Sequence, residues 1–508
     1  MMRIFRHALR LTQIFTTLLR HGALGAVASF GGVLIRPSPA QSRRARERGL
    51  RLARALQDLG PSFIKLGQAM SVRPDLVGRE MAEALSGLRD RLPPFGVARA
   101  RATIEAELGA PLDELFCEFD EHPVAAASIA QVHFAAIAAD EEGAAPRRVA
   151  VKVLRPGIEE AFARDLDLFM ALARLLEWLR PSIRRLRPVD VVKTIRDAVT
   201  IEMDLRLEAA AASELAENFR DDPDYRVPAV DWARTAQRVL TIERVEGYNI
   251  GDHAAIDAAG LNRDELAEKL IRVFLKQALR DGFFHADLHQ GNLFVDADGV
   301  LVPVDFGIMG RLDLDTRRYM ALMLLGFIEG DYRKVADVHF EAGYVPRDQS
   351  RELFAQACRA IGEPILGKPV KEISFGRLLA QLFRTTETFN MQTQPQLLLL
   401  QKTMVTAEGV ARDLSEDINF WEASRPVIED WLVELSSPRA QAELALRKGR
   451  RLLHDIPALA EKVDRIADLW LREHENPSDA PDWEGIWRGA ALTGGVVIAV
   501  LLLLDLLL

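Results

Sequence analysis

Cysteine is scarce in this chain of 508 residues, which has only Cys117 and Cys358, far apart in the sequence. Neither belongs to a Cys-x-x-Cys pair or stands beside a cluster of histidines. The sequence therefore excludes a disulfide framework and a zinc site of the usual spacing. We expect both cysteines to be buried packing thiols in a reducing compartment.

Net positive charge is also missing, because the formal net charge is −9. A general nucleic-acid binder would be basic overall, so nucleic acid is excluded as a partner. No Gly-x-Gly-x-x-Gly opens a βαβ unit, and no cluster of metal ligands suits oxygen activation, which excludes flavin, NAD and oxygenase chemistry. A hydrophobic fraction of 49% nevertheless supplies ample core for a globular protein.

Acidic residues are almost absent from residues 1–54, where Glu47 is the single carboxylate among many arginines. Apolar residues recur at helical spacing in residues 3–20, which predicts a basic amphipathic helix on the surface of an anionic membrane. The arginines interrupt any continuous apolar run, which excludes a secretory signal. A mitochondrial transit peptide and an amphipathic helix packed on the protein remain alternatives.

Long apolar runs are missing until the end of the chain, where residues 489–508 are almost wholly hydrophobic. About twenty helical residues span a hydrocarbon core, so we predict a transmembrane anchor over residues 483–508, with Arg488 on the cytoplasmic side. Asp505 would lie near the far interface, where its charge is tolerated. A buried helix or a dimerisation hairpin, with a homodimer as the partner, is the alternative. A basic and polar helical linker, residues 441–482, precedes this segment.

Two short polar motifs suggest the chemistry of the chain. The first is Phe284-His-Ala-Asp287-Leu-His-Gln-Gly-Asn292, and the second is Asp305-Phe-Gly. The apolar runs and the Asp-Gly turn between them predict a hairpin over residues 293–304, which would bring both motifs to one cavity. Phosphoryl transfer needs oxygen ligands for Mg²⁺ and a carboxylate that orients the nucleophile, and protein kinases carry such motifs in this order. We assign Asp287 to catalysis, and Asn292 and Asp305 to the metal.

Strand patterns begin after residue 115 and predict strands over residues 116–119, 129–138 and 148–154. The alanine-rich loop between the first two takes the place of the kinase glycine-rich loop, and we assign it to ATP; its residues are Ala125, Ala126, Ala127 and Ser128. Alanine avoids positive φ, so this loop must approach phosphates differently from glycine. Lys152, in Val-Ala-Val-Lys, matches the lysine that holds the α- and β-phosphates.

A helix predicted over residues 189–219 carries the acids that would pair with lysines. We assign Glu208 to Lys152, as the catalytic ion pair of a kinase N-lobe, and place Asp204 on the same face at i and i+4. Glu202 points away from both.

A helical extension over residues 55–114 contains Lys65-x-Gly-Gln68, whose two polar side chains share one helix face. Glu202 and Asp204 are the candidate partners of Lys65.

Further strands are predicted over residues 227–230 and 239–244. Glu243 and Val245 would then lie in the hinge, whose backbone holds the adenine edge. Three helices are predicted downstream, over residues 263–281, 317–329 and 396–414.

Together these motifs resemble the UbiB family of atypical kinase-like proteins, which includes the aarF-domain kinases, over roughly residues 55–420. The motifs are Lys65-x-Gly-Gln68, the alanine loop with Ile129-Ala-Gln-Val-His133, Val-Ala-Val-Lys152, Glu202-x-Asp204, the motif at 285–292 and Asp305-Phe-Gly. Gln290 stands where the family usually has proline, and one predicted membrane segment stands where members often have two. Ala286 replaces the arginine of ordinary protein kinases.

The resemblance implies an α+β, two-lobed, protein-kinase-like fold, with a β-rich N-lobe over residues 115–247 and a helical C-lobe over residues 248–440. It implies ATP and Mg²⁺ as cofactors and a role in ubiquinone biosynthesis at the cytoplasmic face of a bacterial inner membrane. Anionic lipids, other ubiquinone-biosynthesis proteins and a lipid-like quinone precursor are the expected partners. It also implies that Lys65, Gln68 and their acidic partners occlude the place where a protein substrate would bind. The alternatives are a nucleotide-binding pseudokinase scaffold and a small-molecule or lipid phosphotransferase.

Overall fold

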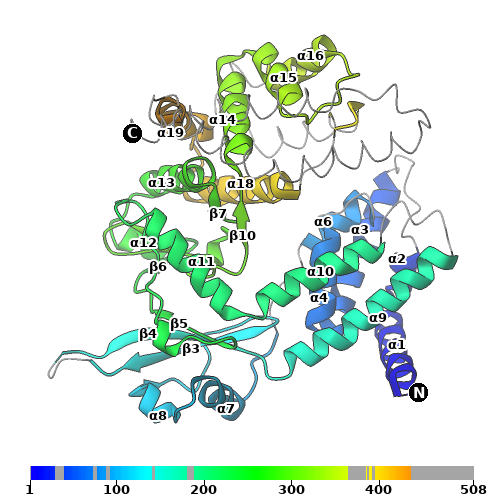
Figure 1. Ribbon diagram of the computed structural model, residues 1–508, viewed down its shortest axis with the longest axis vertical. Helices are drawn as coiled ribbons and strands as arrows, with labels where there is room; N and C mark the ends of the chain where they lie inside the picture. Colours follow the sequence, from blue (N-terminus) through cyan, green and yellow to red (C-terminus); the bar gives the residue numbers. More distant parts are fainter. Residues whose placement is uncertain are drawn as a thin grey trace, which may run out of the picture. The chain divides into compact units, whose positions relative to one another are not determined.

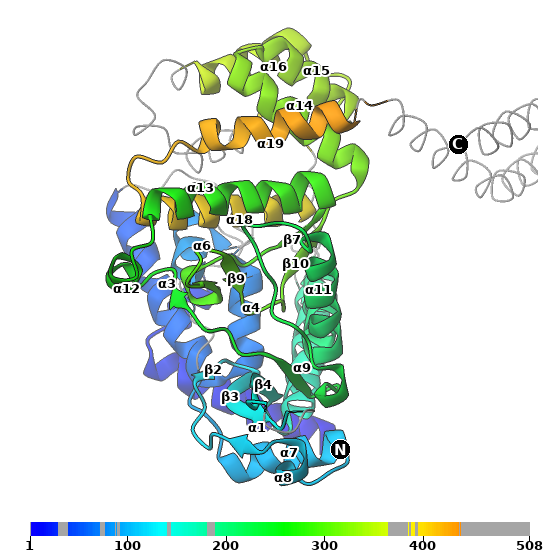
Figure 2. The same cartoon turned by 90° about the vertical axis from the view of Figure 1, so that its left-hand side faces the viewer.

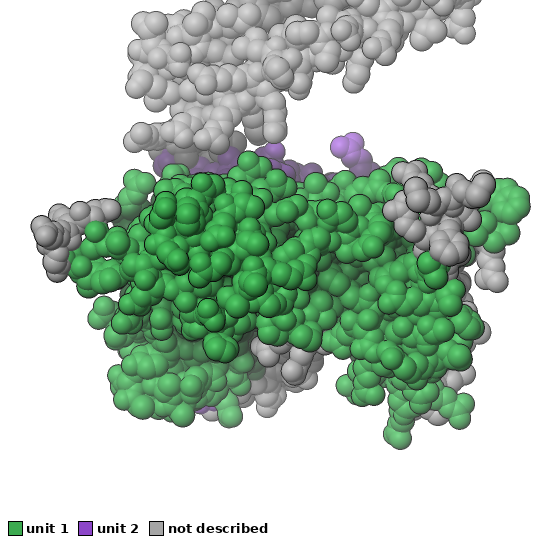
Figure 3. Space-filling model, turned by 90° about the horizontal axis from the view of Figure 1, so that it is seen from below, with its two compact units in different colours: residues 1–273, 283–310, 402–416 green, residues 274–282, 311–401, 417–508 purple. Residues whose placement is uncertain are grey.

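The computed structural model describes residues 2–28, 39–71, 77–86, 88, 92–139, 144–179, 188–363, 385, 388–391, 395–435 and 437. The chain forms two compact units, coloured separately in Figure 3. Unit 1 comprises residues 1–273, 283–310 and 402–416, and unit 2 comprises residues 274–282, 311–401 and 417–508. Within the ranges just given, no helix combines the length and apolarity needed to cross a membrane. The predicted linker 441–482 and anchor 483–508 lie outside those ranges.

An antiparallel sheet in unit 1 has the strand order β1-β3-β4-β5, with β2 added beside β3 (Figure 1). Its strands are β1 (Glu118–Phe119), β2 (Ala125–Ala126), β3 (Ala130–Ile137), β4 (Arg147–Leu154) and β5 (Val239–Glu243). Val149, Val151 and Val153 of β4 face one core, shared with Ile104 of α7 (Val97–Leu108). Because side chains alternate along a strand, Lys152 faces the opposite side of the sheet.

A second part of unit 1 is helical and surrounds one apolar core. Its helices are α1 (Met2–Arg20), α2 (Leu24–Ala28), α3 (Pro39–Leu59), α4 (Pro61–Ser71), α6 (Arg79–Ser86), α9 (Ile158–Leu179) and α10 (Pro188–Glu202). Phe63 of α4 meets Phe169 of α9 edge to face, with ring centroids 5.0 Å apart. The apolar sides of these helices thus bury one another.

The single helix predicted over residues 189–219 is wrong, because the chain forms α10 and then α11 (Leu205–Asn218). Asp204 separates them in an extended conformation, with φ −118° and ψ 92°, and its carboxylate accepts a hydrogen bond from the Arg206 N–H. An N-cap of this kind starts a new helix. Asp204 and Glu208 therefore do not share a face of one helix.

Three smaller expectations are also wrong. Residues 227–230 form no strand, and only a single bridge joins Val230 to Ile242, because Pro228 has no N–H to donate to a ladder. Cys117 is exposed, whereas Cys358 is buried as expected. The first strand covers only residues 118–119, since the Phe116 N–H closes the last turn of α8 (Leu112–Leu115) by donating to the Leu112 carbonyl.

The remaining strands of unit 1 surround the two polar motifs. The predicted hairpin is confirmed as β8 (Leu293–Val295) and β9 (Leu301–Pro303), with β6 (Tyr248–Asn249) on the other side of β8. Gly299 turns the hairpin with φ +76°, a conformation that favours glycine. Strands β7 (Phe283–His285) and β10 (Met309–Arg311) form a separate pair.

The three helices predicted downstream are confirmed as α13 (Arg263–Leu275) with a π-helical segment (Lys276–Asp281), α14 (Leu314–Glu329) and α18 (Pro395–Leu414). The structure adds α12 (His253–Ala258), α15 (Tyr332–Glu341), α16 (Arg351–Gly362) and α19 (Phe420–Leu435). In unit 2, Tyr332, Phe340 and Phe354 belong to one apolar core. Figures 1 and 2 both show α18 beside α13, and residues 402–414 of α18 and 263–273 of α13 belong to unit 1.

Candidate active site

Lys152 lies at the centre of the sheet, opposite Val132 of β3 and Leu240 of β5. Its ammonium donates to both carboxylate oxygens of Glu208, at 2.7 and 2.9 Å, and to Oδ1 of Asp305 at 3.3 Å. The side chains of Lys152 and Glu208 are 18% and 7% exposed. Lys152, Glu208 and Asp305, assigned to one site from the sequence, thus lie together.

The charges of this cluster shift its proton equilibria. Burial alone would lower the pKa of Lys152, but Asp305 and Glu208 outweigh burial and raise this pKa above its ordinary value. Desolvation opposes ionisation of Asp305, but Lys152 and the Gly307 N–H hold its pKa below the ordinary range. Burial raises the pKa of Glu208 to about 7, against the opposing effect of Lys152. The single ammonium of Lys152 is thus shared by the carboxyl groups of Glu208 and Asp305.

His285 joins the two polar motifs. Its Nε2 contacts the carbonyl oxygen of Asp305, and its Nδ1 accepts a hydrogen bond from the Asp287 N–H at 3.1 Å. Only a neutral ring with the proton on Nε2 satisfies both bonds. Burial lowers the pKa of His285, which favours this neutral form. The neutral histidine therefore joins the motif at 285–292, here called the catalytic loop after its kinase counterpart, to the Asp-Phe-Gly segment.

Asn292 and Asp305 offer the oxygen donors that suit Mg²⁺. The Asn292 Nδ2 donates to the Asp287 carbonyl oxygen at 3.3 Å, which leaves its Oδ1 for another partner. The side chain of Asp305 is 44% exposed. Among the described residues no group of three or more His, Cys, Asp or Glu gathers as a metal cage. A magnesium ion carried by nucleotide phosphates needs only one or two protein ligands, so this pair fits the ion.

The alanine loop is a tight hairpin between β2 and β3. Ala125 pairs with Val132, Ala126 pairs with Gln131, and the Ala127 N–H donates to the Ala130 carbonyl at 2.8 Å. Among the residues that the structure describes, the only one other than glycine with positive φ is Asn390. The loop thus has an ordinary backbone, as the absence of glycine predicts.

The same loop contains two features that the sequence analysis missed. Ser128 is fully buried, and its hydroxyl has no hydrogen-bond partner among the residues the structure describes. The Arg155 guanidinium donates to the carbonyl oxygens of Ala127, at 3.0 Å, and Pro93, at 2.8 Å. Arg155 therefore holds the loop against the Pro93-Pro94 break, and its position directly after β4 was the available signal.

The predicted hinge needs one correction. The Glu243 N–H already donates to the Ala229 carbonyl at 2.8 Å, and the Glu243 carboxylate pairs with Arg226 at 2.7 Å. The amide of Glu243 is therefore not available to a base, and its side chain has a structural role. Val245 remains the candidate for an adenine contact.

Lys65 pairs with Glu202, with the ammonium 2.7 Å from Oε2 and side chains 11% and 17% exposed. Asp204, the other candidate, instead pairs with Arg206 at 2.6 Å and caps α11. The choice follows from the break between α10 and α11, which turns Asp204 to its own helix start. Gln68 lies on α4 with Lys65 and is half-buried.

Helix α18 supplies contacts to the catalytic loop that sequence reasoning missed. The Thr403 hydroxyl donates to the Ala286 carbonyl at 3.2 Å, and the Gln290 amide donates to the Asp413 carboxylate. The ammonium of Lys402 lies 3.5 Å from Oδ1 of Asp287. The helix was predicted, but its polar residues are more than one hundred positions away in sequence from the loop.

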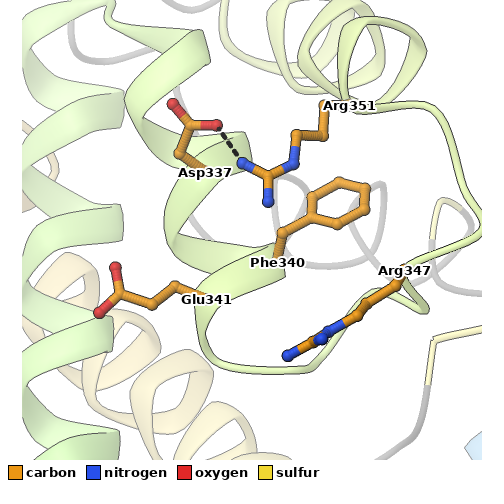
Figure 4. Close-up of a pocket in the computed structure, with 5 residues that line it drawn as sticks. All are labelled: Asp337, Phe340, Glu341, Arg347 and Arg351. Carbon is orange, nitrogen blue, oxygen red and sulfur yellow. Dashed lines mark hydrogen bonds and ion pairs between the residues drawn. The ribbon is translucent and has the colours of Figure 1, made fainter.

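Unit 2 has a separate cavity of about 630 Å³ between α15 and the start of α16 (Figure 4). Arg351 pairs there with Asp337 at 3.1 Å and stacks over Phe340 at 5.0 Å. Arg347 and Glu341 complete the lining. This mixture of charges resembles no phosphoryl-transfer site, and none of the predicted site residues lies in it.

Comparison with known proteins adds to this geometry. Residues 87–339 match the ABC1 atypical kinase-like domain, and residues 358–419 match the UbiB helical domain. A probable protein kinase UbiB from Marinobacter nauticus is 46% identical over 395 residues, covering 77% of this chain and 71% of the relative. Another from Azotobacter vinelandii is 40% identical over 474 residues, covering 90% and 85%.

A solved structure shares the fold. It is a Mycobacterium tuberculosis protein in complex with erythromycin, 25% identical, with a TM-score of 0.51 over 77% of this chain and 97% of that chain. The domain matches and the curated relatives indicate the same family, and the solved structure has a similar fold. The chain belongs to the UbiB family of ABC1 atypical kinase-like proteins.

Proposed function

We propose that this chain is a membrane-associated atypical kinase or ATPase that binds ATP with Mg²⁺ and supports ubiquinone biosynthesis. The observation that carries the proposal is the position of Lys152, whose ammonium is shared by Glu208 at 2.7 Å and Asp305 at 3.3 Å. A lysine fixed in this way beside a carboxylate that suits magnesium is the arrangement that phosphoryl transfer requires.

In the proposed reaction Lys152 holds the α- and β-phosphates, and Asp305 and Asn292 would hold Mg²⁺, which would neutralise charge on the nucleotide. Asp287 orients the attacking hydroxyl or water and accepts its proton. The alanine hairpin, with Ala125, Ala126, Ala127 and Ser128, covers the phosphates, and Val245 meets the adenine.

A small or lipid-like acceptor, or water, fits this proposal better than a protein substrate. Lys65 and Glu202 form a poorly exposed pair that ties α4 to α10, and with Gln68 they would restrict the entrance of a large substrate. A quinone precursor is one such acceptor. The names of the curated UbiB relatives support the link to ubiquinone biosynthesis.

Attachment to the cytoplasmic face of a bacterial inner membrane is part of the proposal. Leu11, Phe15 and Leu19 of α1 are 40%, 55% and 58% exposed, and their spacing of four residues places them on one helix face. Such a face suits an anionic membrane surface. The apolar residues 489–508 would add a spanning anchor.

The alternative function is a pseudokinase scaffold that binds nucleotide without turnover and assembles other biosynthetic proteins. The retention of Asp287, Asn292 and Asp305 together favours chemistry, because a scaffold does not need a proton acceptor and metal ligands. Accumulation of a prenylated phenol in a strain that lacks this protein would support the quinone assignment. A normal quinone pool in that strain would contradict it.

The substitution Asp305→Asn tests the nucleotide site. Removing the carboxylate charge should abolish Mg²⁺-dependent ATP binding. At one hundred times the dissociation constant, bound ATP stabilises the wild type by about 2.7 kcal/mol, and this shift should vanish in the variant in a thermal titration.

Asp298→Asn is the matched control, because Asp298 lies in the turn of the β8–β9 hairpin that precedes Asp305. This variant should keep the full stabilisation by ATP and Mg²⁺. A wild-type protein with no shift, or an Asp305→Asn variant stabilised as strongly as the wild type, would refute the proposed site.

A further inference from the structure

The motif at residues 285–292, which contains Asp287, and the Asp305-Phe-Gly segment contain no lysine or arginine. From Phe283 to Gly310 the sequence has neither lysine nor arginine. A transferring γ-phosphoryl group carries charge on three oxygens, and this charge requires stabilisation by metal and by positive side chains. Lys152 already bonds to Glu208 and Asp305. A further cation must therefore come from another part of the chain.

Lys402 of α18 lies in the position to supply it. Its ammonium is 3.5 Å from Oδ1 of Asp287, and the two side chains are 49% and 29% exposed. The other oxygen of Asp287, Oδ2, lies 3.6 Å from Nε2 of His289. The lysine is thus beside the acceptor side of the site, and half of its side chain remains accessible to a ligand.

The position of Lys402 is fixed by the helix that carries it. Its neighbour Thr403 is fully buried and donates to the Ala286 carbonyl, directly before Asp287. Asp413, about 15 Å further along α18 than Thr403, accepts from Gln290 of the same loop and contacts His253 at 3.1 Å. Two separated attachments set both the height and the rotation of α18 against the loop.

We propose that Lys402 is the γ-phosphate-binding cation of this enzyme and that it also holds Asp287 in place. The inference rests on the proposed function and deepens it, because the UbiB helical domain then contributes directly to the active site. In the step, the bond from the γ-phosphorus to the bridging oxygen breaks, and ADP leaves with the electron pair. The acceptor oxygen bonds to phosphorus, and its proton passes to Asp287. Lys402 transfers no proton in this step.

The test compares ATP with ADP, because only ATP has the γ-phosphate. Binding of each nucleotide with Mg²⁺ is measured by displacement of a fluorescent ADP from the full-length protein. Lys402→Met should weaken ATP binding roughly tenfold and leave ADP binding unchanged. Lys402→Arg, which keeps the charge, should restore most of the preference for ATP.

Lys193→Met is the matched control, because Lys193 is also exposed and paired with a carboxylate, Asp190, at 3.3 Å. It should bind both nucleotides as the wild type does. Lys402→Met with an unchanged preference for ATP, or with an equal loss of ATP and ADP binding, would overturn the proposal. A wild type that binds neither nucleotide would instead refute the proposed function itself, and the inference with it.

Discussion

At the scale of single residues, the charge balance around Lys152 explains why nucleotide and metal should enter together. The ammonium neutralises part of the charge on Glu208 and Asp305, and Asp287 adds a third carboxyl group to the site. With Lys402 beside Asp287 the carboxyl groups still outnumber the cations, so a bare triphosphate would meet net negative charge. Mg²⁺ held by Asp305 and Asn292 would supply compensating positive charge. We therefore expect the site to select the metal complex of ATP.

His339 gives a prediction about pH. This histidine is 3% exposed in the core of unit 2, and its ring hydrogen-bonds to the Val335 carbonyl at 2.7 Å. Burial lowers its pKa from 6.5 to about 4. The unfolded chain therefore binds more protons between these values, and stability should fall as pH decreases from 6.5 to 4. The loss should be up to about 1.4 kcal/mol per pH unit.

Urea unfolding of the wild type and His339→Asn across this pH range measures the effect. The asparagine amide can still donate to Val335 but does not titrate, so the variant should depend less steeply on pH. His122→Asn is the control, because His122 is 97% exposed, and it should match the wild type. Identical pH slopes in His339→Asn and the wild type would show that His339 does not govern acid stability.

The individual site residues were predictable to the extent that they belong to local motifs. Lys152, Asp287, Asn292 and Asp305 each stand in a short pattern with a defined chemical role; the pairing of Lys152 with Glu208 is confirmed, and the roles in catalysis and metal binding stay predictions. The choice between Glu202 and Asp204 was not predictable, because it depended on where a helix ended. Lys402 was hidden for a different reason: its partner Asp287 is 115 positions away in the sequence, and no local pattern joins them.

At the scale of elements, α4 depends on a glycine for its position. An added Cβ on Gly67 would lie 2.3 Å from Cδ1 of Leu88 and 2.8 Å from Cδ1 of Leu56. Gly67→Ala should therefore displace α4, which carries Lys65. Overpacking costs about 1–3 kcal/mol, and the better helix propensity of alanine returns about 1 kcal/mol. We expect a net destabilisation of about 1 kcal/mol, measured by urea unfolding.

Gly409→Ala is the matched control, because Gly409 is also helical and its added Cβ meets nothing within 4 Å. Only the propensity gain remains there, so this variant should be more stable by about 0.5–1 kcal/mol. Equal effects of the two substitutions would contradict the close packing around Gly67.

The predicted elements failed where one polar or proline residue overrode a longer pattern. Helical spacing continues through residues 189–219, yet Asp204 ends one helix and caps the next. Valines favour a strand over residues 227–230, yet Pro228 removes a donor and leaves one bridge. The hairpin at residues 293–304 succeeded because its Asp-Gly turn and its apolar runs agree.

At the scale of the whole molecule, a segment near the C-terminal end of the described chain contacts the candidate active site. Residues 402–416 belong to unit 1, although the preceding residues 311–401 belong to unit 2. This return brings Thr403 and Asp413 to the catalytic loop. The sequence predicted the helix at 396–414 but not the unit to which it belongs. Hydrophobic spacing indicates a helix locally, whereas the contacts of this helix are with residues more than one hundred positions earlier in the chain.

The orientation of α1 determines which of its residues can meet a membrane. Arg10 is turned to the protein, since its guanidinium donates to both oxygens of Asp165 at 2.8 Å and to the Leu59 carbonyl at 2.9 Å. Leu18 is buried in the helical core of unit 1. The structure thus shows α1 packed on the protein, which was an alternative in the sequence analysis. Membrane contact stays a proposal, and the exposed side chains of Leu11, Phe15 and Leu19 leave a different part of the helix surface for it.

Membrane binding through α1 is tested in a chain that lacks residues 483–508, so that a spanning anchor cannot mask it. This chain should sediment with anionic vesicles at low salt and less at high salt, because interfacial attachment combines apolar burial with screened charge. Phe15→Glu places a carboxylate at the centre of the exposed face and should abolish sedimentation. Leu353→Glu, at an equally exposed leucine of unit 2, should leave it intact. If both variants bind vesicles like the truncated parent, the exposed face of α1 is not the membrane contact; if the truncated parent does not bind at all, residues 483–508 provide the whole attachment.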